Sequence, residues 1–175
     1  MFKIIAIVAV VLLAGILIYG ATRPDTFSVL RATRIKAEPE KIFPLINDLN
    51  RWGAWSPYEK KDPAMKRSFS GAASGKGAVY EWDGNKEIGQ GSMEIMDASP
   101  PSRVTIKLDF IKPFEAHNIV EFALQPQGDA TSVTWSVHGP MPFVSKLIGL
   151  FIDMDKMIGK DFEAGLASLK AIAER

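Results

Sequence analysis

The sequence predicts an α+β fold: a curved, seven-stranded antiparallel sheet with two short helices and one long C-terminal helix, preceded by a single N-terminal transmembrane helix. Three observations lead to this prediction. The chain begins with an uncharged apolar run, its middle part alternates apolar and polar residues, and its last part repeats apolar residues at helical spacing. A sheet and a helix that are each apolar on one side bury those sides against each other.

The N-terminal run from Ile4 to Thr22 contains no charged side chain, and Lys3 and Arg23 flank it. A helix of this length extends about 28 Å, close to the roughly 30 Å hydrocarbon core of a bilayer. A cleaved signal peptide is the alternative, but its apolar core would span only about 7–15 residues. Gly20-Ala21-Thr22 is also a weak cleavage site. We therefore predict an uncleaved membrane anchor.

The predicted anchor covers residues 1–24, and one folded domain covers residues 25–175. Lys3 and the amino terminus compete with Arg23 and Arg31 under the positive-inside rule. We favour an N-terminus inside the cytoplasm. The expectation is a single-pass membrane protein, attached through residues 4–22, with its folded domain on the extracytoplasmic side.

The domain is formally neutral. The chain has 21 basic and 20 acidic residues, and the first 25 residues contain only Lys3, Arg23 and Asp25 of these, so the remainder carries equal numbers of each sign. A neutral domain without a basic run argues against nucleic-acid binding, and we expect no nucleic-acid partner. The chain has no cysteine, which excludes disulfides, thiolate nucleophiles and cysteine-based metal sites. We expect no cofactor and no metal.

The first elements of the domain follow from local patterns. Residues Phe27 to Lys36 are rich in β-branched side chains and predict a strand. Pro39, with acidic neighbours, suits the first turn of a helix. Apolar residues then recur at helical spacing as far as Leu49, which predicts one short helix, and a second short helical piece is expected around Asp48 to Trp52. The next segment, Gly53 to Pro63, is predicted to be a loop.

Six further segments alternate apolar and polar residues and are separated by turn residues, as in a half-buried antiparallel sheet. These predicted strands are Met65 to Ser70, Ala78 to Asp83, Ile88 to Asp97, Arg103 to Ile111, Glu115 to Gln125 and Thr131 to His138.

From Pro142 onward the apolar residues recur at helical spacing over about seven turns and predict one continuous helix. The stripe consists of Leu147, Phe151, Met154, Ile158, Phe162, Leu166, Leu169 and Ile172. Gly149, Gly159 and Gly165 lie within this helix, although each Gly costs a helix interior roughly 0.5–1 kcal/mol relative to Ala. Gly165 lies close to the stripe, so we expect the helix backbone to approach the sheet closely there.

Several short motifs are spread over residues 27 to 175. They are Asn47-Asp48-Leu49, Trp52-x-x-Trp55-Ser56-Pro57, Asp62-Pro63-Ala64-Met65, Tyr80-x-Trp82-x-Gly84-Asn85, Leu108-Asp109-Phe110-x-Lys112-Pro113-Phe114, Thr134-Trp135 and the stretch from Asp155 to Lys170. Together with the order of elements, these motifs resemble the START-like (SRPBCC) superfamily, whose members share the helix-grip fold. The chain looks most like bacterial polyketide cyclase/dehydrase-like proteins of that superfamily.

The resemblance implies a deep apolar cavity between the sheet and the long helix, which would hold a lipid, isoprenoid, polyketide or other hydrophobic molecule. The candidates for lining it are Tyr80, Trp82, Phe110, Asn118, Phe122, Trp135, Phe151, Met154, Ile158 and Phe162. The alternative is a filled core, because aromatic residues at strand or helix spacing are usually core residues. Trp52 and Trp55 are expected to plug the open end of the sheet, with a gate or a membrane-facing lip as the alternative.

The sequence shows no catalytic constellation, so we assign no catalytic residue and expect binding more than catalysis. His117 and His138 are the only histidines, and strand alternation points both away from the cavity. No motif for a metal site, a P-loop or a nucleophile elbow occurs. An acid at the mouth of the cavity could still come from Glu59 or Asp62. Asp155 and Asp161, which flank the apolar stripe of the last helix, are expected to form salt bridges or to face solvent, for example Asp155 with Lys156 or Lys160.

We therefore expect a membrane-tethered module that binds or transports a hydrophobic small molecule or lipid. Two alternatives stay open: a polyketide cyclase/dehydratase-like enzyme acting on a hydrophobic substrate, and a regulatory protein-interaction domain whose partner the sequence does not name. The segment from Phe143 to Ile152 is apolar nearly all round, which points to a membrane, a ligand or a protein on a second face of this part of the helix.

Overall fold

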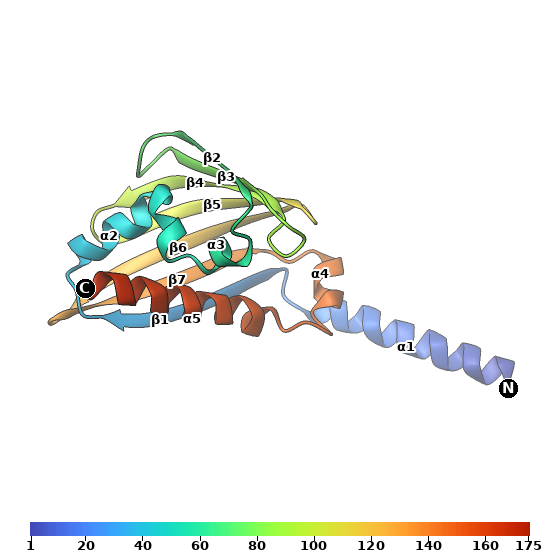
Figure 1. Ribbon diagram of the computed structural model, residues 1–175. Helices are drawn as coiled ribbons and strands as arrows, with labels where there is room; N and C mark the ends of the chain where they lie inside the picture. The colour runs from blue at the N-terminus through green and yellow to red at the C-terminus, as the bar shows by residue number, and fades with distance from the viewer.

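The computed structural model describes residues 1–175 and shows a curved sheet, a long helix across its concave side and one helix that projects from the end of the domain (Figure 1). The helices are α1 (Phe2–Thr22), α2 (Pro39–Asn47), the 3-10 helix η1 (Leu49–Ala54), α3 (Pro57–Lys61), α4 (Phe143–Ile148) and α5 (Met154–Ala173). The strands are β1 (Thr26–Ile35), β2 (Lys66–Gly71), β3 (Ala78–Asp83), β4 (Gln90–Ser99), β5 (Arg103–Lys112), β6 (Ala116–Gln127) and β7 (Ala130–Pro140).

All seven strands form one antiparallel sheet in the order β1-β7-β6-β5-β4-β3-β2. From β2 to β7 each strand pairs with the next in sequence, whereas β1 pairs with β7, with Thr26 opposite Pro140 and Ile35 opposite Thr131. The α+β prediction with a seven-stranded antiparallel sheet is confirmed. The alternation that predicted it is seen as alternating burial, for example at Val133, Trp135 and Val137 of β7.

The concave side of the sheet is covered by α5 and by the three short helices that follow β1. In Figure 1, α5 runs along β1 and β7, and α2, η1 and α3 lie above it. The apolar stripe of α5 faces the sheet, with Phe162, Leu166 and Leu169 buried. This is the arrangement expected when a one-sided sheet and an amphipathic helix bury their apolar sides together.

The last helix differs from the prediction, because the chain forms two helices where one was expected. The break covers Gly149 to Asp153. Asp153 is the N-cap of α5, and its side chain accepts a hydrogen bond from the Lys156 backbone N–H at 3.1 Å. An N-capping Asp satisfies a free backbone donor and so favours a new helix start. The predicted loop from Gly53 to Pro63 is also partly helical, since α3 begins at Pro57, a residue suited to a first helical turn.

The expected close approach at Gly165 is confirmed. A Cβ atom placed on Gly165 would lie 2.6 Å from Cζ3 of Trp135 and 3.0 Å from Cδ of Pro57. Such distances are shorter than carbon–carbon contact, so the helix can lie this close to the sheet only because residue 165 has no side chain.

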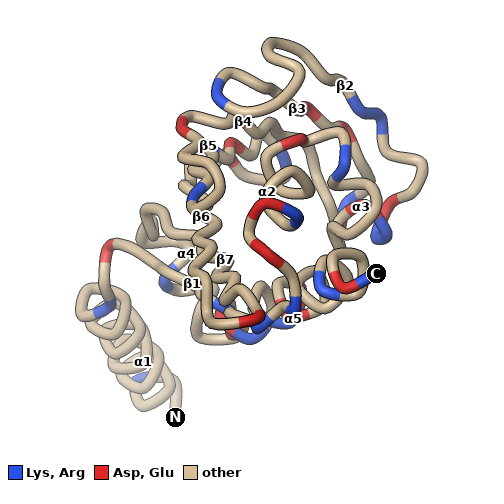
Figure 2. Tube along the Cα trace, turned by 90° about the vertical axis from the view of Figure 1, so that its left-hand side faces the viewer, with Lys and Arg blue, Asp and Glu red and all other residues tan.

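At the other end of the chain, α1 is a continuous helix with almost all of its side chains exposed. It is long and apolar enough to cross a membrane. In Figure 2, charge is seen only near the two ends of α1. In the sequence these charges are Lys3, in its first turn, and Arg23, directly after its last residue. Gly20 is its one buried residue, and it packs against the side chains of Phe143 and Leu147 of α4. The helix is thus exposed along its length and packed against the domain only at its end.

Candidate functional site

The centre of the concave side is a packed aromatic cluster. Trp135 and Phe162 stack with their ring centroids 4.0 Å apart, and Phe122 also stacks on Trp135, with its centroid at 5.0 Å. Trp52 and Trp55 contact both Phe122 and Trp135 edge-on. These rings fill the space between the sheet and the middle of α5 with side chains.

Trp52 and Trp55 are the plugs that the sequence analysis favoured over a gate. Both are buried, and each indole N–H donates to a backbone carbonyl of α2, at 2.9 Å to Ile46 and 2.9 Å to Leu45. A tryptophan whose polar atom is satisfied inside the protein is held in place. These two residues therefore close one end of the concave side.

The ten predicted lining residues fall into three groups. Six are buried on the concave side: Tyr80, Trp82, Asn118, Phe122, Trp135 and Phe162. Phe110, Met154 and Ile158 are partly exposed. Phe151 lies in the break between α4 and α5 and is 89% exposed, so its predicted place in one continuous helical stripe is wrong. Ligand contact by the other nine residues stays a prediction.

Two of the buried residues have polar atoms without a protein partner. They are the Asn118 side-chain oxygen Oδ1 and the Trp135 indole nitrogen Nε1. Leaving such a group without a hydrogen bond costs about 1–3 kcal/mol, so native proteins rarely keep one unless water or a ligand binds to it. Asn118 and Trp135 lie on adjacent strands, and they offer one acceptor and one donor on the concave side.

A cavity of about 550 Å³ lies at the junction of α1 and the domain. Its walls come from residues between Tyr19 and Val29, from Met141 and Lys146, and from the whole segment Gly149 to Asp155. Eight of its sixteen lining residues are hydrophobic. Phe151 and Met154 are the two predicted lining residues that belong to it. This cavity, which we call the junction cavity, is mixed in polarity and sits where the sheet, the start of α5 and α1 meet.

A smaller cavity of about 140 Å³ lies elsewhere, under η1 at the β2–β3 edge of the sheet. It is lined by Leu49, Asn50, residues 69–73, Ala78 and Val79. None of the predicted lining residues belongs to it. Its size admits only a very small molecule, so it contributes little to a site for a lipid-sized ligand.

An ion pair ties α4 to the beginning of the domain at the wall of the junction cavity. Lys146 Nζ lies 2.5 Å from Asp25 Oδ1, and the Lys146 side chain is only 6% exposed. The Met141 backbone N–H also donates to the Asp25 carbonyl at 2.7 Å. Lys146 holds the pKa of Asp25 below its usual range, through the hydrogen bond and the charge. The pair fixes α4 next to the end of α1.

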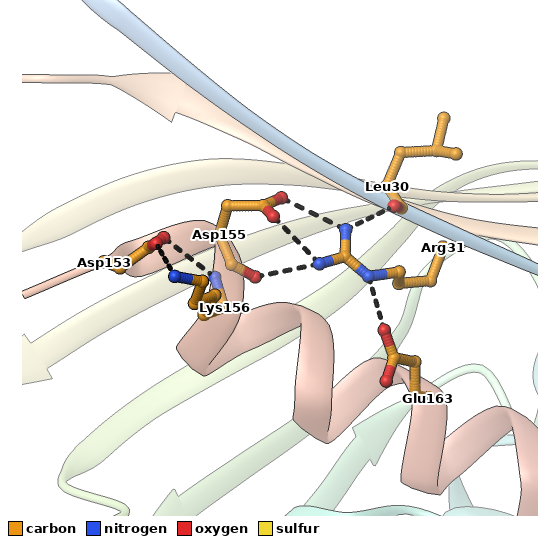
Figure 3. Close-up of polar contacts among 6 residues, drawn as sticks. All are labelled: Leu30, Arg31, Asp153, Asp155, Lys156 and Glu163. Atoms are coloured by element: carbon orange, nitrogen blue, oxygen red, sulfur yellow. Dashed lines mark hydrogen bonds and ion pairs between the residues drawn. The ribbon is translucent and has the colours of Figure 1, made fainter.

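Arg31 forms a second bridge at the cavity, between the edge strand β1 and α5 (Figure 3). Its guanidinium contacts Asp155 at 2.9 Å and Glu163 at 2.8 Å, and it donates to the Leu30 carbonyl at 2.8 Å. It lies over Gly159, where any Cβ atom would collide with it. Asp155 pairs with Arg31 and not with the nearby lysine that the sequence analysis expected. The reason is geometric, since a planar guanidinium can serve two carboxylates at once.

These charges raise and lower pKa values in the directions expected for an ion pair. The hydrogen bonds to Asp155 and Glu163 raise the pKa of Arg31, and the hydrogen bond from Arg31 lowers the pKa of Asp155. Both groups stay charged over the whole range near neutral pH. The bridge therefore joins β1 to the first three turns of α5 at any physiological pH.

A third polar group lies on the concave side near β2 and β3. The Tyr80 hydroxyl donates to Glu59 Oε1 at 2.6 Å, and Arg67 Nε donates to Glu59 Oε2 at 2.7 Å. The Glu59 side chain is 10% exposed. Burial, and then the hydrogen bond to Glu59, raises the pKa of Tyr80. Asp62, the other candidate acid, accepts hydrogen bonds from the backbone N–H groups of Ala64 and Asn85 and so has a structural role.

The two histidines are exposed, whereas Asp161 is largely buried in an ion pair. His117 is 62% exposed and pairs with Asp109 at 2.8 Å. His138 lies at the exposed end of β7. Asp161 pairs with Lys61 at 2.7 Å. No group of three or more His, Cys, Asp or Glu side chains is placed to hold a metal ion.

Sequence reasoning missed the junction cavity and Arg31. A signal for Arg31 was present, because strand alternation puts it on the same side of β1 as Val29 and Ile35, both of which are buried. An arginine on an inward-facing strand position needs an acidic partner. Asp155 and Glu163, two helical turns apart in one helix, were the available pair.

Comparisons with known proteins agree with the observed fold. A family model described as polyketide cyclase / dehydrase and lipid transport matches residues 26–174. No curated protein matches the chain.

Solved structures share the fold at low identity. Protein CV1439 from Chromobacterium violaceum superposes with a TM-score of 0.60 at 16% identity, over 87% of this chain and 99% of that one. The Aha1 dimer from Colwellia psychrerythraea gives a TM-score of 0.60 at 18% identity, over 85% and 96%. The major latex-like protein 151 of Panax ginseng gives 0.59 at 14% identity, over 87% and 100%. These similarities concern the fold.

Proposed function

The chain belongs to the polyketide cyclase/dehydrase and lipid-transport family, and from this we propose that it is a membrane-tethered module that binds a hydrophobic small molecule or lipid. In this proposal α1 anchors the protein through residues 1–24, and residues 25–175 form the binding domain. The junction cavity is the observation that carries the proposal, because it places a partly apolar space of about 550 Å³ beside the helix that is apolar enough to cross a bilayer.

The position of the cavity suits a ligand that partitions into membranes. Its walls combine apolar side chains such as Phe27 and Leu150 with Lys146 and Arg23. An amphiphile has an apolar part and a polar head, and a mixed lining offers contacts to both. Asn118 and Trp135, whose buried polar atoms have no partner in the protein, do not line this cavity, so the proposal gives them no part in binding there.

The test reconstitutes the full chain in phospholipid vesicles that contain a long-chain fatty acid carrying a diazirine. After illumination, mass spectrometry locates the cross-linked peptides. We expect cross-links on residues 27–29 and 149–155 in addition to α1, which meets the lipid in any case. Cross-links confined to α1 would contradict a ligand site in the domain.

A matched pair of variants sharpens this test. Met154→Trp adds volume to the wall of the junction cavity and should reduce cross-linking in the domain. Met157→Trp makes the same change one turn later, at a residue that is 54% exposed and lies outside the cavity. It should leave the cross-linking pattern unchanged. Equal effects of the two variants would point to a general disturbance of α5.

We also propose that the domain lies on the extracytoplasmic side. A C-terminal fusion to a reporter enzyme that is active only outside the cytoplasm should be active, while an expressed but inactive fusion would contradict this orientation. The same fusion does not depend on ligand binding, so the two parts of the proposal can fail separately.

An enzyme of the cyclase or dehydratase type is the second candidate, and the Glu59–Tyr80 hydrogen bond of 2.6 Å favours it. The raised pKa of Tyr80 keeps its hydroxyl protonated, so that it could donate a proton or a hydrogen bond to a substrate carbonyl. Against this, Glu59 is already paired with Arg67, and neither Glu59 nor Tyr80 lines the junction cavity. If this candidate is right, turnover of a poly-β-keto substrate by the purified protein should be lost in Tyr80→Phe.

A further inference from the structure

We infer that α4 and its connection to α5, residues 143–152, form a second membrane contact beside α1, so that the junction cavity opens at the bilayer surface. This inference rests on the proposed tethering by α1. It adds the place from which the ligand would enter, and it names the lipid bilayer as the partner of an exposed apolar surface.

The exposed apolar side chains of the domain are not spread evenly. Outside α1, twelve large hydrophobic side chains are exposed, and nine of them lie in residues 111–114 or 143–157. Phe151 is 89% exposed, Phe114 75% and Val144 66%. Soluble proteins rarely gather exposed apolar side chains in this way, and such a patch marks an interaction surface.

Both segments lie at the end of the domain from which α1 projects. Ile111 lies at the end of β5, and Phe114 lies in the turn between β5 and β6. The β6 residue Ile119 pairs with His138, near the end of β7 that leads into α4. Figure 1 shows the start of β1, α4 and the tip of the β5–β6 hairpin at the α1 end of the sheet. The opposite end, where the C-terminus lies, is closed by α2 and the tryptophan plugs.

In α4 the charged side chain faces the protein and the apolar side chains face outward, the reverse of a helix at a water-exposed surface. Its one charged residue, Lys146, is turned into the protein and is 6% exposed, while Phe143, Val144 and Ile148 are 42%, 66% and 39% exposed. A helix at the surface of a soluble domain shows the opposite arrangement, with its apolar side inward. Apolar residues outward and the charge inward fit a helix that lies against hydrocarbon.

The packing of α4 on α1 determines how deep α4 would lie in the bilayer. Gly20, two residues before the end of α1, packs against the side chains of Phe143 and Leu147. A 21-residue helix rises about 31 Å, which matches the hydrocarbon core, so Gly20 would lie near its boundary. Tyr19 and Arg23, which contact each other there, are residue types suited to that boundary. The exposed side of α4 would then lie at the same level, in contact with lipid.

This arrangement would join the cavity to the membrane. Leu150, Phe151 and Ile152 line the junction cavity and are also exposed. If these side chains lie in the bilayer surface, a lipid can pass into the cavity without crossing water. The continuity with α1 favours a bilayer over a protein partner, because the membrane is already adjacent wherever α1 is inserted.

The test measures depth at single sites in the full chain reconstituted in phosphatidylcholine–phosphatidylglycerol vesicles. The chain has no cysteine, so an introduced cysteine carries the only spin label. Val144→Cys and Phe151→Cys place labels on the patch, and Val10→Cys places one in α1. Phe69→Cys is the matched control, since Phe69 is an exposed aromatic residue of the far edge strand β2. The readout compares label collisions with lipid-soluble oxygen and with a water-soluble nickel chelate.

We expect the labels of Val144→Cys and Phe151→Cys to collide more with oxygen than with nickel, as that of Val10→Cys does, and the label of Phe69→Cys to show the reverse. If the patch labels match Phe69→Cys while Val10→Cys is in lipid, the second contact is wrong and the tether stands. If the patch labels are shielded from both reagents, a protein covers the patch and the inference is again wrong. If Val10→Cys itself is in water, the proposed tethering fails and this inference fails with it.

A second measurement asks whether the contact matters for uptake. Combining Val144→Asp with Ile148→Asp places two carboxylates on exposed positions of α4 that do not line the junction cavity, which should keep this surface out of the bilayer and leave the cavity wall unchanged. Cross-linking of residues 27–29 by the diazirine fatty acid in vesicles should be lost, while cross-linking in α1 persists. Unchanged domain cross-linking in this variant would overturn the role of the patch in uptake.

Discussion

Arg31 and Asp155 join the edge strand of the sheet to the first turn of α5, with Arg31 Nη2 2.9 Å from Asp155 Oδ2 and Nη1 3.1 Å from Oδ1 (Figure 3). The same guanidinium reaches Glu163 at 2.8 Å. One residue thereby holds two turns of the helix against β1, directly beside the junction cavity. Opening of the domain between β1 and α5 would have to break these contacts first.

We therefore expect Arg31→Lys to lower the thermal midpoint of unfolding and to increase hydrogen exchange in the first turns of α5. A lysine ammonium is a point charge on a flexible stem and cannot serve both carboxylates in the planar arrangement. Lysine also keeps the positive charge, so the comparison isolates geometry from charge. Arg34→Lys is the control, because Arg34 forms an ion pair with Asp129 alone and its side chain is 61% exposed. Equal losses in the two variants would contradict a special role for Arg31.

Gly165→Leu is expected to destabilise the domain by about 1–3 kcal/mol, the usual cost of overpacking, or to prevent folding. Even a Cβ atom at this position would lie 2.6 Å from the Trp135 ring, which is itself held between Phe122 and Phe162 and has no room to move. Gly53→Ala is the matched control, since a Cβ atom there meets nothing within 4 Å. Urea unfolding measures both, and an unchanged midpoint for Gly165→Leu would show that the helix can move away from the sheet.

Gly165 is an example of a contact that could be predicted from the sequence. Its position beside the apolar stripe predicted close packing, because helical spacing fixes which residues face a sheet. The strands followed in the same way from their period of two. The break at Gly149 to Asp153 could not be read from spacing, because the apolar residues on both sides remain in phase across it. The break depends on the hydrogen bond that the Asp153 side chain accepts as the N-cap of α5. Tertiary contacts decide whether the chain forms this cap or one continuous helix.

The candidate site was less predictable than the fold. Alternation correctly placed Trp135 and Phe122 on the concave side, but it cannot tell a packed core from a cavity wall, since both are apolar. The junction cavity depends on where α1 leaves the domain and on the Lys146–Asp25 pair, which joins residues 121 positions apart in the chain. Side-chain contacts between such distant segments follow from the assembled structure and not from local pattern.

Tyr80→Phe should lower stability by about 1–2 kcal/mol near neutral pH, because it removes a hydrogen bond to a buried carboxylate. The pKa of Tyr80 is raised from an ordinary value of 10.0, so the folded state holds this proton more tightly than the unfolded state. The contribution is complete below pH 10 and is lost as the pH rises from there towards the folded-state pKa. Urea unfolding between pH 8 and 11, roughly the range around the tyrosine pKa, should show a steeper fall for the wild type than for Tyr80→Phe.

Tyr58 is a control for this pH dependence. Burial raises its pKa as well, and the nearby charge of Asp161 adds to the effect. Tyr58→Phe should therefore also flatten the alkaline fall in stability, but it should cost less near neutral pH, because the nearby Asp161 accepts a hydrogen bond from Lys61 and not from the Tyr58 hydroxyl. The same loss at neutral pH in both variants would argue that the Glu59 contact contributes nothing.

His117 is expected to titrate above its ordinary pKa of 6.5, because it hydrogen-bonds Asp109 at 2.8 Å. The stabilisation by this pair is present below the unfolded-state pKa of the imidazole and is lost as the pH rises through the folded-state value. The pKa of Asp109 is lowered from 3.8, so its own contribution is lost as the pH falls through the acid range. NMR titration of the imidazole measures this, and Asp109→Asn should bring the His117 pKa down; no change would rule out the pair in solution.

Gly20→Leu should separate α4 from the end of α1. A Cβ atom on Gly20 would lie 2.7 Å from Cε2 and 3.0 Å from Cζ of Phe143, so a larger side chain must displace that ring and the helix that carries it. The Lys146–Asp25 pair resists the displacement, because it ties the same helix to the start of the domain. Spin labels introduced by Ala21→Cys and Val144→Cys report the distance between the two helices. In Gly20→Leu the mean distance should increase and the distribution of distances should become broader. Gly15→Leu is the control, since nothing lies within 4 Å of a Cβ atom there and the distance should not change. An equal distance in all three proteins would mean that the contact between Gly20 and Phe143 does not hold α4 in place, and the depth of α4 would then depend on the ion pair alone.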